Sequence, residues 1–394
     1  MIKLKEVAHY VSDKINISAL TRNEYITTDN MLPNKGGITD CENLPQAARV
    51  TKYECGDILV SNIRPYFKKI WYANKVGGCS NDVIVFRANN DGWNSKFLYY
   101  VLSQNSFFDF VMSGANGTKM PRGNKDLILD FLVPNFNTKK QKNIADVLSA
   151  YDDMIENNQK QIKLLEEAAQ RLYKEWFVDF RFPGYENAKF IDGIPEGWKV
   201  RPLSEIFDFI RGKSYASKEL VDQGGVIMIN LKNIKAFGGY KRNVEKRFIG
   251  KFKDEQKILA GDIVMGVTDM TKERRLVGYV AIIPNLGETA IFSMDLIKLI
   301  PKTVTRGYLY TTMLYGEYSK RISLLANGVN VLHLKPDAIM GITMLVPSEI
   351  IMEQYEHKFE LYRQKIELLQ TQCNIFTEAR GRLLPKLMSG EIEV

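Results

Sequence analysis

Two short segments in the first half of the chain contain side chains that can bind a nucleic acid. One follows an apolar stretch and alternates basic with aromatic residues, and the other is a loop of basic and amide residues. Lys and Arg neutralise phosphates, while Arg and Asn can hydrogen-bond to base edges. The candidates in this half are Arg64, Tyr66, Lys68, Lys69, Asn116, Lys119, Arg122 and Lys125.

The second half offers a similar set around its most basic segment. From Arg211 to Arg275, 15 Lys and Arg against 8 Asp and Glu give 15 − 8 = +7, close to the net charge of +8 for all 394 residues. Such a local charge suits a polyanionic partner, although a solvated lysine-rich surface has the same composition. The candidates are Lys241, Arg242, Lys246, Arg247, Lys251, Thr268, Arg274, Arg275, Asn327, Asn330 and His333.

Catalytic chemistry has no comparable pattern. The sequence contains no Asn/Asp-Pro-Pro-Tyr/Phe methyltransferase motif, no GxGxxG loop and no HExxH pair. Residues 211–214, Arg-Gly-Lys-Ser, end like a phosphate-binding loop, but Phe207 stands where the first glycine would be. The three histidines (His9, His333 and His357) lack metal-ligand spacing. We therefore predict no catalytic residue and no metal site; a nucleic-acid enzyme with a cryptic site stays an alternative.

The elements that must position the candidates are duplicated. Gly56-Asp57-Ile58-Leu59-Val60 returns as Gly261-Asp262-Ile263-Val264-Met265, a turn followed by an apolar strand, and Ala115-Asn116-Gly117 returns as Ala326-Asn327-Gly328. Five such patterns recur in the same order, at offsets from 199 residues (Leu4 to Leu203) to 213 (Phe131 to Met344). This order indicates a tandem duplication with small insertions.

Each copy ends in a segment with heptad spacing. The first runs from Ile144 to Trp176 with Asn158 as its polar member, and the second from Tyr355 to Leu387 with Arg380 as the exception. A buried Asn in a seam typically fixes register, which fits two helices that pair in one alignment. Because a whole module separates them in the sequence, we predict that they pair antiparallel within the chain; the alternative is that each packs only on its own module. The predicted seam includes Ile144, Leu148, Ile155, Asn158, Ile162, Leu165, Leu172, Phe359, Ile366, Leu369, Phe376 and Leu383.

The first helix would hold the two modules apart. Its 33 residues (144–176) would span about 49 Å, equivalent to roughly 14 base pairs. Modules held in this way could meet one face of a duplex at least one turn apart. The predicted target is therefore two short specific sequences around unread bases, and it is asymmetric because the modules differ in sequence.

These features resemble the specificity (S) subunits of Type I restriction-modification systems over essentially the whole chain. The most specific pieces are residues 167–180 (EAAQRLYKEWFVDF), 194–198 (IPEGW) and 383–392 (LLPKLMSGEI). Residues 56–65 (GDILVSNIRP) also look like the family's. The second module departs from the first in having Val329 for Thr118 and Gly266 for Ser61, as expected of modules that read different half-sites.

The resemblance implies an α+β fold with two mixed α/β target-recognition domains in a pseudo-twofold arrangement, separated by two long helices that form an antiparallel coiled coil. The expected segments are a first recognition domain (1–137, module 1), a central helix region (138–184), a second recognition domain (185–347, module 2) and a C-terminal helix region (348–394).

The resemblance also implies a non-catalytic chain that binds double-stranded DNA, two methyltransferase (M) subunits and, in the full complex, restriction (R) subunits. Adenine methylation and DNA cleavage, with S-adenosylmethionine, ATP and Mg²⁺, would belong to those partners, and no cofactor to this chain. Residues 139–179 carry 7 basic and 8 acidic residues, so their outward face is predicted to dock M subunits. A modification-only or fused restriction system stays an alternative.

A membrane location is not predicted. The first residues, Met1 to Glu6, have no signal-peptide stretch, and no window offers about 18 uncharged apolar residues. We therefore expect a folded cytoplasmic protein with no membrane partner.

Overall fold

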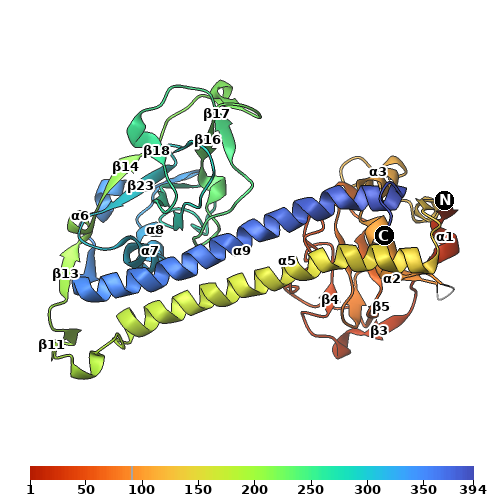
Figure 1. Cartoon of the computed structure of the whole chain (residues 1–394), viewed down its shortest axis with the longest axis horizontal. Helices are drawn as coiled ribbons and strands as arrows, with labels where there is room; N and C mark the ends of the chain where they lie inside the picture. The colour runs from red at the N-terminus through yellow and green to blue at the C-terminus, as the bar shows by residue number, and fades with distance from the viewer. Residues whose placement is uncertain (90–91) are drawn as a thin grey trace. The chain divides into compact units, whose positions relative to one another are not determined.

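The computed structural model describes residues 1–89 and 92–394, and the chain divides into two compact units. Unit 1 comprises Met1–Asn158 and Gln372–Val394, and unit 2 comprises Gln159–Thr371. The borders fall inside both long helices, so each unit contains one module and a part of each helix (Figure 1).

Module 1 is built from short strands and short helices. Its strands are β1 (Ile2–Lys3), β2 (Ala8–Tyr10), β3 (Lys14–Asn16), β4 (Tyr25–Ile26), β5 (Arg49–Tyr53), β6 (Ile58–Ser61), β7 (Ile70–Tyr72), β8 (Gly77–Cys79), β9 (Val83–Ala88) and β10 (Leu132–Val133). Its helices are α1 (Leu4–Val7), α2 (Ser95–Leu102), α3 (Asn105–Ser113) and α4 (Lys125–Ile128).

Module 2 repeats this plan with extra strands. Its strands are β11 (Phe190–Ile191), β12 (Ile194–Pro195), β13 (Lys199–Pro202), β14 (Phe207–Arg211), β15 (Leu220–Val221), β16 (Val226–Ile229), β17 (Lys246–Phe248), β18 (Lys257–Ile258), β19 (Ile263–Gly266), β20 (Thr268–Asp269), β21 (Val280–Ile282), β22 (Ala290–Phe292), β23 (Leu296–Pro301), β24 (Leu332–His333) and β25 (Thr343–Val346). Its helices are α6 (Leu203–Ile206), α7 (Arg306–Tyr315) and α8 (Tyr318–Ser323).

Sheet topology confirms the duplication. Module 1 has a four-stranded sheet in the order β2-β9-β6-β7, and module 2 has β14-β23-β19-β21. The central strands β6 and β19 follow the repeated Gly-Asp turns and are buried throughout. Strand pairs β1–β10 and β13–β25 also correspond. In each pair a strand near the start of the module pairs antiparallel with one near its end.

The second sheets share a core but differ at an edge. A parallel pair, β4–β8 in module 1 and β16–β22 in module 2, joins an antiparallel strand that precedes the Gly-Asp turn. Module 2 adds β17 and β15 beyond β16, whereas module 1 adds β3 beyond β5. The added strand β17 carries Lys246 and Arg247, so part of the basic segment lies where the modules have diverged.

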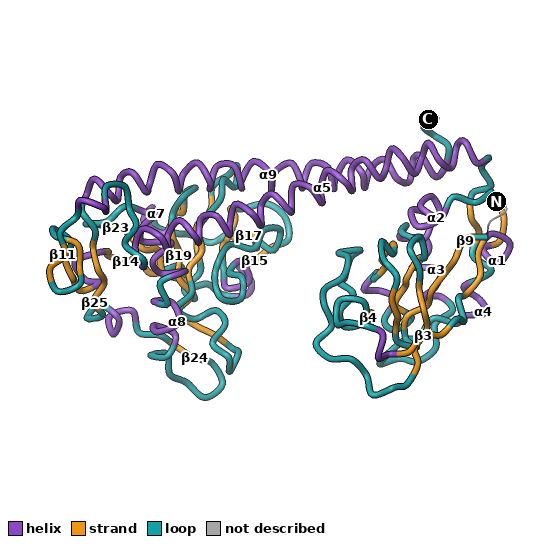
Figure 2. Tube along the Cα trace, turned by 90° about the horizontal axis from the view of Figure 1, so that it is seen from below, coloured by secondary structure: helices purple, strands orange, loops and turns teal. Residues whose placement is uncertain are grey.

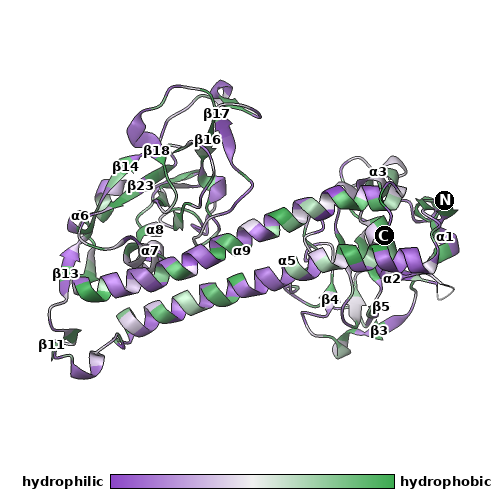
Figure 3. Cartoon of the chain, viewed as in Figure 1, coloured by the Kyte–Doolittle hydropathy of each residue, from purple (hydrophilic) through white to green (hydrophobic). Residues whose placement is uncertain are grey.

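The two long helices are α5 (Thr138–Tyr173), followed by a π-helical turn over Lys174–Val178, and α9 (Glu349–Ser389). They pair antiparallel as predicted. In unit 1 the rings of Tyr151 and Phe376 lie 6.3 Å apart, and in unit 2 those of Trp176 and Tyr355 lie 5.8 Å apart. Every predicted seam residue is buried or partly buried, and Figure 3 shows hydrophobic and hydrophilic turns alternating along both helices.

The ends of the helices also enter the cores of the modules. Ile144 and Leu148 of α5 and Leu387 of α9 pack together with module 1, while Tyr355 and Phe359 of α9 pack with module 2. The alternative prediction, that each helix packs only on its own module, is therefore wrong, because the end of α9 packs on the other module's core. In the described part of the chain, no helix combines the length and hydrophobicity needed to cross a membrane.

Candidate nucleic-acid interface

The repeated Gly-Asp pair has a structural role at the start of the central strand. Gly56 has φ +94°, a left-handed conformation that is open to glycine because it lacks Cβ. Asp57 is 2% exposed; its carboxylate accepts the backbone N–H of Glu54 at 2.7 Å and the guanidinium of Arg87 at 2.8 and 2.7 Å. In module 2, Asp262 accepts the N–H of Leu259 at 2.9 Å. These contacts hold the strand that leads into the candidate loops.

In module 1 the structure brings the two candidate segments together. Ile63 and Arg122 form an antiparallel bridge, and the N–H of Arg64 donates to the carbonyl of Pro121 at 2.8 Å. Asn116 and Arg122 exchange two backbone hydrogen bonds of 2.9 Å each. The side chains of Arg64, Asn116, Lys119, Arg122 and Lys125 are exposed, so this loop pair presents amide and cationic groups to solvent.

A short 3-10 helix, Pro65–Phe67, presents the aromatic candidates beside them. The residues on either side, Arg64 and Lys68, have left-handed φ of +50° and +53°, a strained conformation for residues with Cβ that is enriched at functional sites. Tyr66 is 47% exposed and its ring lies 4.7 Å from that of Phe67. This backbone projects two rings that are available to stack on bases.

Other candidates of module 1 already have partners in the protein. The ammonium of Lys68 donates to Asn105 Oδ1 at 2.9 Å, and that of Lys69 donates to the carbonyl of Thr28. Arg122 lies 3.2 Å from Asp82 but remains exposed. Lys68 and Lys69 are thus engaged in fixing the loop.

Lys35, which was not among the sequence candidates, lies against the same loop. It hydrogen-bonds through its backbone N–H to the carbonyl of Lys68 at 3.0 Å. Burial lowers the pKa of its ammonium, and the nearby charges of Lys68 and Arg380 lower it further. The sequence Lys35-Gly36-Gly37 predicts a turn, but no local pattern predicts that this turn lies against Lys68.

Module 2 repeats the loop pair. Strand β20 pairs antiparallel with β24, which places Thr268 opposite His333. His333 and Asn327 exchange backbone hydrogen bonds of 3.0 and 2.8 Å, as Arg122 and Asn116 do in module 1. Figure 2 shows β24 and its neighbouring loops on the side of unit 2 that faces away from α5 and α9.

Four candidates of module 2 already have polar partners within the protein. Thr268 is 8% exposed and donates its hydroxyl to Asp295 at 3.0 Å. Arg242 turns to α9, where it donates to Gln370 at 3.2 Å and lies 3.7 Å from Glu367. The other two are Arg247, which pairs with both oxygens of Glu288 at 2.9 and 2.6 Å, and Arg274, which donates to the carbonyl of Ser323 at 2.7 Å.

The remaining candidates of module 2 are exposed but do not gather at one place in the fold. Asn327, Asn330 and His333 lie on the loop that includes β24, and Arg275 follows β20. Lys241, Lys246 and Lys251 lie around β17. The exposed candidates of module 2 therefore form two groups, of which the one at the β20–β24 loop pair corresponds to that of module 1.

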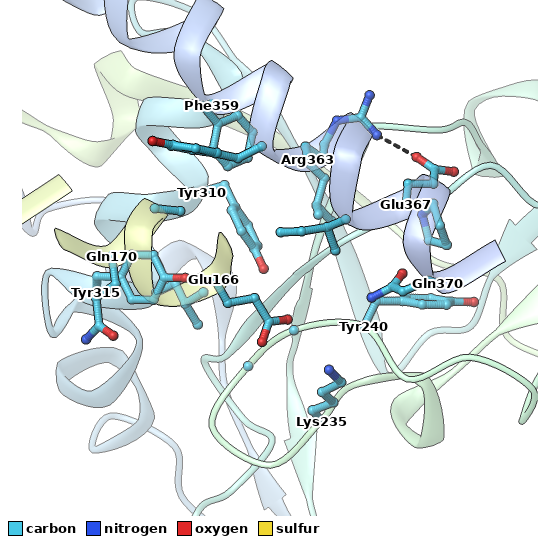
Figure 4. A pocket seen from close by; sticks show the side chains of 18 of the residues that line it. Glu166, Gln170, Lys235, Tyr240, Tyr310, Tyr315, Phe359, Arg363, Glu367 and Gln370 are labelled. Atoms are coloured by element: carbon cyan, nitrogen blue, oxygen red, sulfur yellow. Dashed lines mark hydrogen bonds and ion pairs between the residues drawn. The ribbon is translucent and has the colours of Figure 1, made fainter. Parts of the chain in front are cut away.

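Unit 2 also contains a cavity of about 520 Å³ between α5, α9 and module 2. Tyr240, Tyr310 and Phe359 surround it (Figure 4). Its Arg363 lies 3.0 Å from Glu367, and Glu367 also accepts the N–H of Asn285 at 2.6 Å. The bond from Asn285 fastens module 2 to α9, while Arg363 holds Glu367 in place along the helix. Among residues 1–89 and 92–394, no group of three or more His, Cys, Asp or Glu side chains could hold a metal ion.

Comparison with known proteins agrees with the duplicated plan. The family model for the Type I restriction modification DNA specificity domain matches twice, over residues 2–167 and 195–370. The chain belongs to this family. Each match includes one module with its loop pair and a part of the helix that follows it.

Relatives and a solved structure extend the likeness. The MjaIX specificity subunit of Methanocaldococcus jannaschii is 26% identical over 77% of this chain and 70% of that protein. The HindI specificity subunit of Haemophilus influenzae is 23% identical over 99% and 98%. The crystal structure of a Type I restriction-modification S subunit from M. genitalium has a TM-score of 0.63 at 15% identity, covering 98% of this chain and 95% of that one. The two-domain fold predicted from the sequence is therefore confirmed.

Proposed function

We propose that this chain is the non-catalytic specificity subunit of a Type I restriction-modification complex and recognises a bipartite, asymmetric DNA sequence. The observation that carries the proposal is the loop pair present in both modules, Ile63–Arg122 and Thr268–His333. The backbone plan is shared, whereas the exposed side chains differ, with Arg122 replaced by His333. Since base edges are read by side chains, each module would read a different half-site.

The partners in this proposal are double-stranded DNA, two M subunits and R subunits. S-adenosylmethionine, ATP and Mg²⁺ would be bound by the M and R subunits, which would methylate adenine and cleave DNA. The long helices support a docking role, because they expose apolar side chains in both units. These are Met154 and Ile375 in unit 1 and Leu164, Leu361 and Leu368 in unit 2, with exposures from 38% to 63%.

The docking role can be tested by introducing charge without removing a helix, since helix ends are part of both cores. Leu164→Asp and Leu368→Asp should each reduce co-purification of the M subunit. Ile249→Asp is the matched control, because Ile249 is 59% exposed but lies outside the helices. Undiminished co-purification of both helix variants would contradict docking at these positions.

The recognition role is tested by reconstituting the full chain with its M subunit and mapping methylated adenines across a genome. A split asymmetric motif is expected. A continuous palindrome, or methylation without a motif, would overturn the proposal. Adding the R subunit, ATP and Mg²⁺ then distinguishes a restriction complex from one that only modifies DNA.

A further inference from the structure

Module 2 exposes apolar side chains at its candidate loop pair. Val329 is 99% exposed, Met270 80% and Leu324 66%. Apolar side chains that are exposed together mark surfaces that bind a partner. They were not among the residues selected from the sequence, because that selection favoured charge and amide groups.

Backbone and side-chain contacts join the chain segments that carry these three residues. The antiparallel register of β20 and β24 sets Asp269 opposite Leu332. Met270, which follows the end of β20, is therefore at the same end of the strand pair as the segment containing Val329, which precedes β24. The guanidinium of Arg274 donates to the carbonyl of Ser323, the neighbour of Leu324, at 2.7 Å. We call the patch formed by Met270, Leu324 and Val329 the apolar tip. It is built from three segments of the chain.

The surroundings of the apolar tip suit DNA. Five exposed cations lie on the same three segments and on the chain just after β24. Three exposed acids accompany them, namely Glu273 beside Arg275, Glu317 beside Lys320, and Asp337, so positive charge is in excess. The amides of Asn327 and Asn330 are also exposed. The cations are Lys272, Arg275, Lys320, Arg321 and Lys335. A cationic rim fits phosphates, and the C5 methyl of thymine is the apolar group that the major groove presents.

We propose that Val329 and Met270 contact a thymine methyl group in the major groove, so that the half-site read by module 2 contains an A·T pair recognised by its methyl. This rests on the proposed function and names the base chemistry that module 2 reads. Module 1 has Thr118 where module 2 has Val329, so its corresponding loop offers a hydroxyl at that position. The two half-sites would thus be read by different chemistry at corresponding loops.

The test uses the full chain reconstituted with its M subunit and the target obtained by methylation mapping. Each thymine of the target is replaced in turn by deoxyuridine, which lacks only the methyl. At one or more positions in a single half-site, affinity should fall about fourfold, the value of one buried methyl. The variant Met270→Ser/Val329→Ser should bind thymine and deoxyuridine DNA equally well. Both residues are exposed, so the fold should tolerate serine.

Leu259→Ser is the matched control, because Leu259 is 70% exposed at the opposite end of β19 and should keep the fourfold preference. Specific binding that no deoxyuridine weakens would overturn the inference but leave the proposed function standing. Absence of any specific binding by the unaltered complex would instead overturn the proposed function. If affinity rises when a cytosine of the target is replaced by 5-methylcytosine, but does not fall with any deoxyuridine, the assignment to thymine would be overturned. Loss of M-subunit association in the double variant would overturn it as well.

Discussion

The side-chain amide of Asn158 donates a hydrogen bond to Oε1 of Gln372 at 3.1 Å, joining α5 to α9 within unit 1. Asn158 is 7% exposed, so the polar seam residue expected from the sequence has a partner on the facing helix. The neighbouring carbonyl of Ile155 lies 3.8 Å from the thiol of Cys373. An antiparallel register that shifted by one residue would break these contacts.

Asn158→Ala should lower the free energy of unfolding by about 1–2 kcal/mol, because it leaves a partly buried Gln372 without its donor. Urea denaturation measures the change. Asn157→Ala is the control on the exposed neighbouring position. Equal stability of the two variants would show that the hydrogen bond contributes nothing.

The charged exception in the second seam, Arg380, forms an ion pair with Asp152, and Asp152 also accepts the hydroxyl of Tyr100. Both ions are about one quarter exposed, so each single neutralisation should cost about 1 kcal/mol. A double-mutant cycle with Asp152→Asn and Arg380→Gln should give a coupling energy of similar size. Strict additivity of the two single changes would contradict the pairing.

Arg64→Ala should weaken specific DNA binding about tenfold or more, the cost of one lost base or phosphate contact. Arg64→Lys separates the two cases, because Lys keeps the charge needed at a phosphate but lacks the rigid planar fork with which Arg matches guanine O6 and N7. Titration of target and altered DNA by the reconstituted complex measures both effects. Lys142→Ala on α5 should bind normally, and an Arg64→Ala complex that matches it would remove Arg64 from the interface.

Adjacent residues in module 2 should behave differently. Lys241→Ala should reduce the slope of log affinity against log salt concentration by about 1, because Lys241 is exposed and its proposed contact with a phosphate is lost. Arg242→Ala should leave that slope unchanged and lower stability by about 1–2 kcal/mol, since its guanidinium contacts Glu367 and Gln370. An equal change of slope in both variants would return Arg242 to the DNA interface.

Asp269 should make the stability of module 2 depend on acid pH. Burial alone would raise the pKa of its carboxyl, but donors from Thr271, Leu276 and Val277 outweigh burial and hold the pKa below its ordinary value of 3.8. A carboxyl whose pKa is lower in the folded than in the unfolded state stabilises the fold at every pH above the unfolded pKa. This stabilisation is lost as the pH falls through the lower, folded pKa.

Asp269→Asn should therefore cost about 1.5–3 kcal/mol near neutral pH, and its difference from the unaltered protein should shrink below pH 3.8. Denaturation curves over a pH series provide the measurement. Asp222→Asn, at an exposed position, should show neither effect. A constant difference at all pH values would mean that the charge of Asp269 is unimportant.

Much of the fold follows from local sequence pattern. Repeated Gly-Asp turns and apolar strands predict the duplicated sheets, and heptad spacing predicts α5 and α9 together with their seam. The short helices α2, α3, α7 and α8 were not predicted. In α7 every residue from Gly307 to Met313 is buried, so its sequence shows no helical periodicity.

The candidate interface was also predicted only in part from local sequence. Residue type and loop position selected Arg64, Asn116 and Arg122, and the structure brings their backbones together at one loop pair. Arg242 and Thr268 looked equally suitable, but their partners Glu367 and Asp295 are far along the chain. Exposure of Met270 and Val329 was likewise hidden, because hydrophobicity alone favours a place in the core.

The sequence by itself determined the tandem plan of module and helix, the family and the polar seam residue, since these depend on spacing within short windows. Only the tertiary structure decided which cations face solvent, which loops meet, and that the end of α9 packs on module 1. Those outcomes depend on pairing between residues that are distant in sequence, and local pattern carries no record of such pairing.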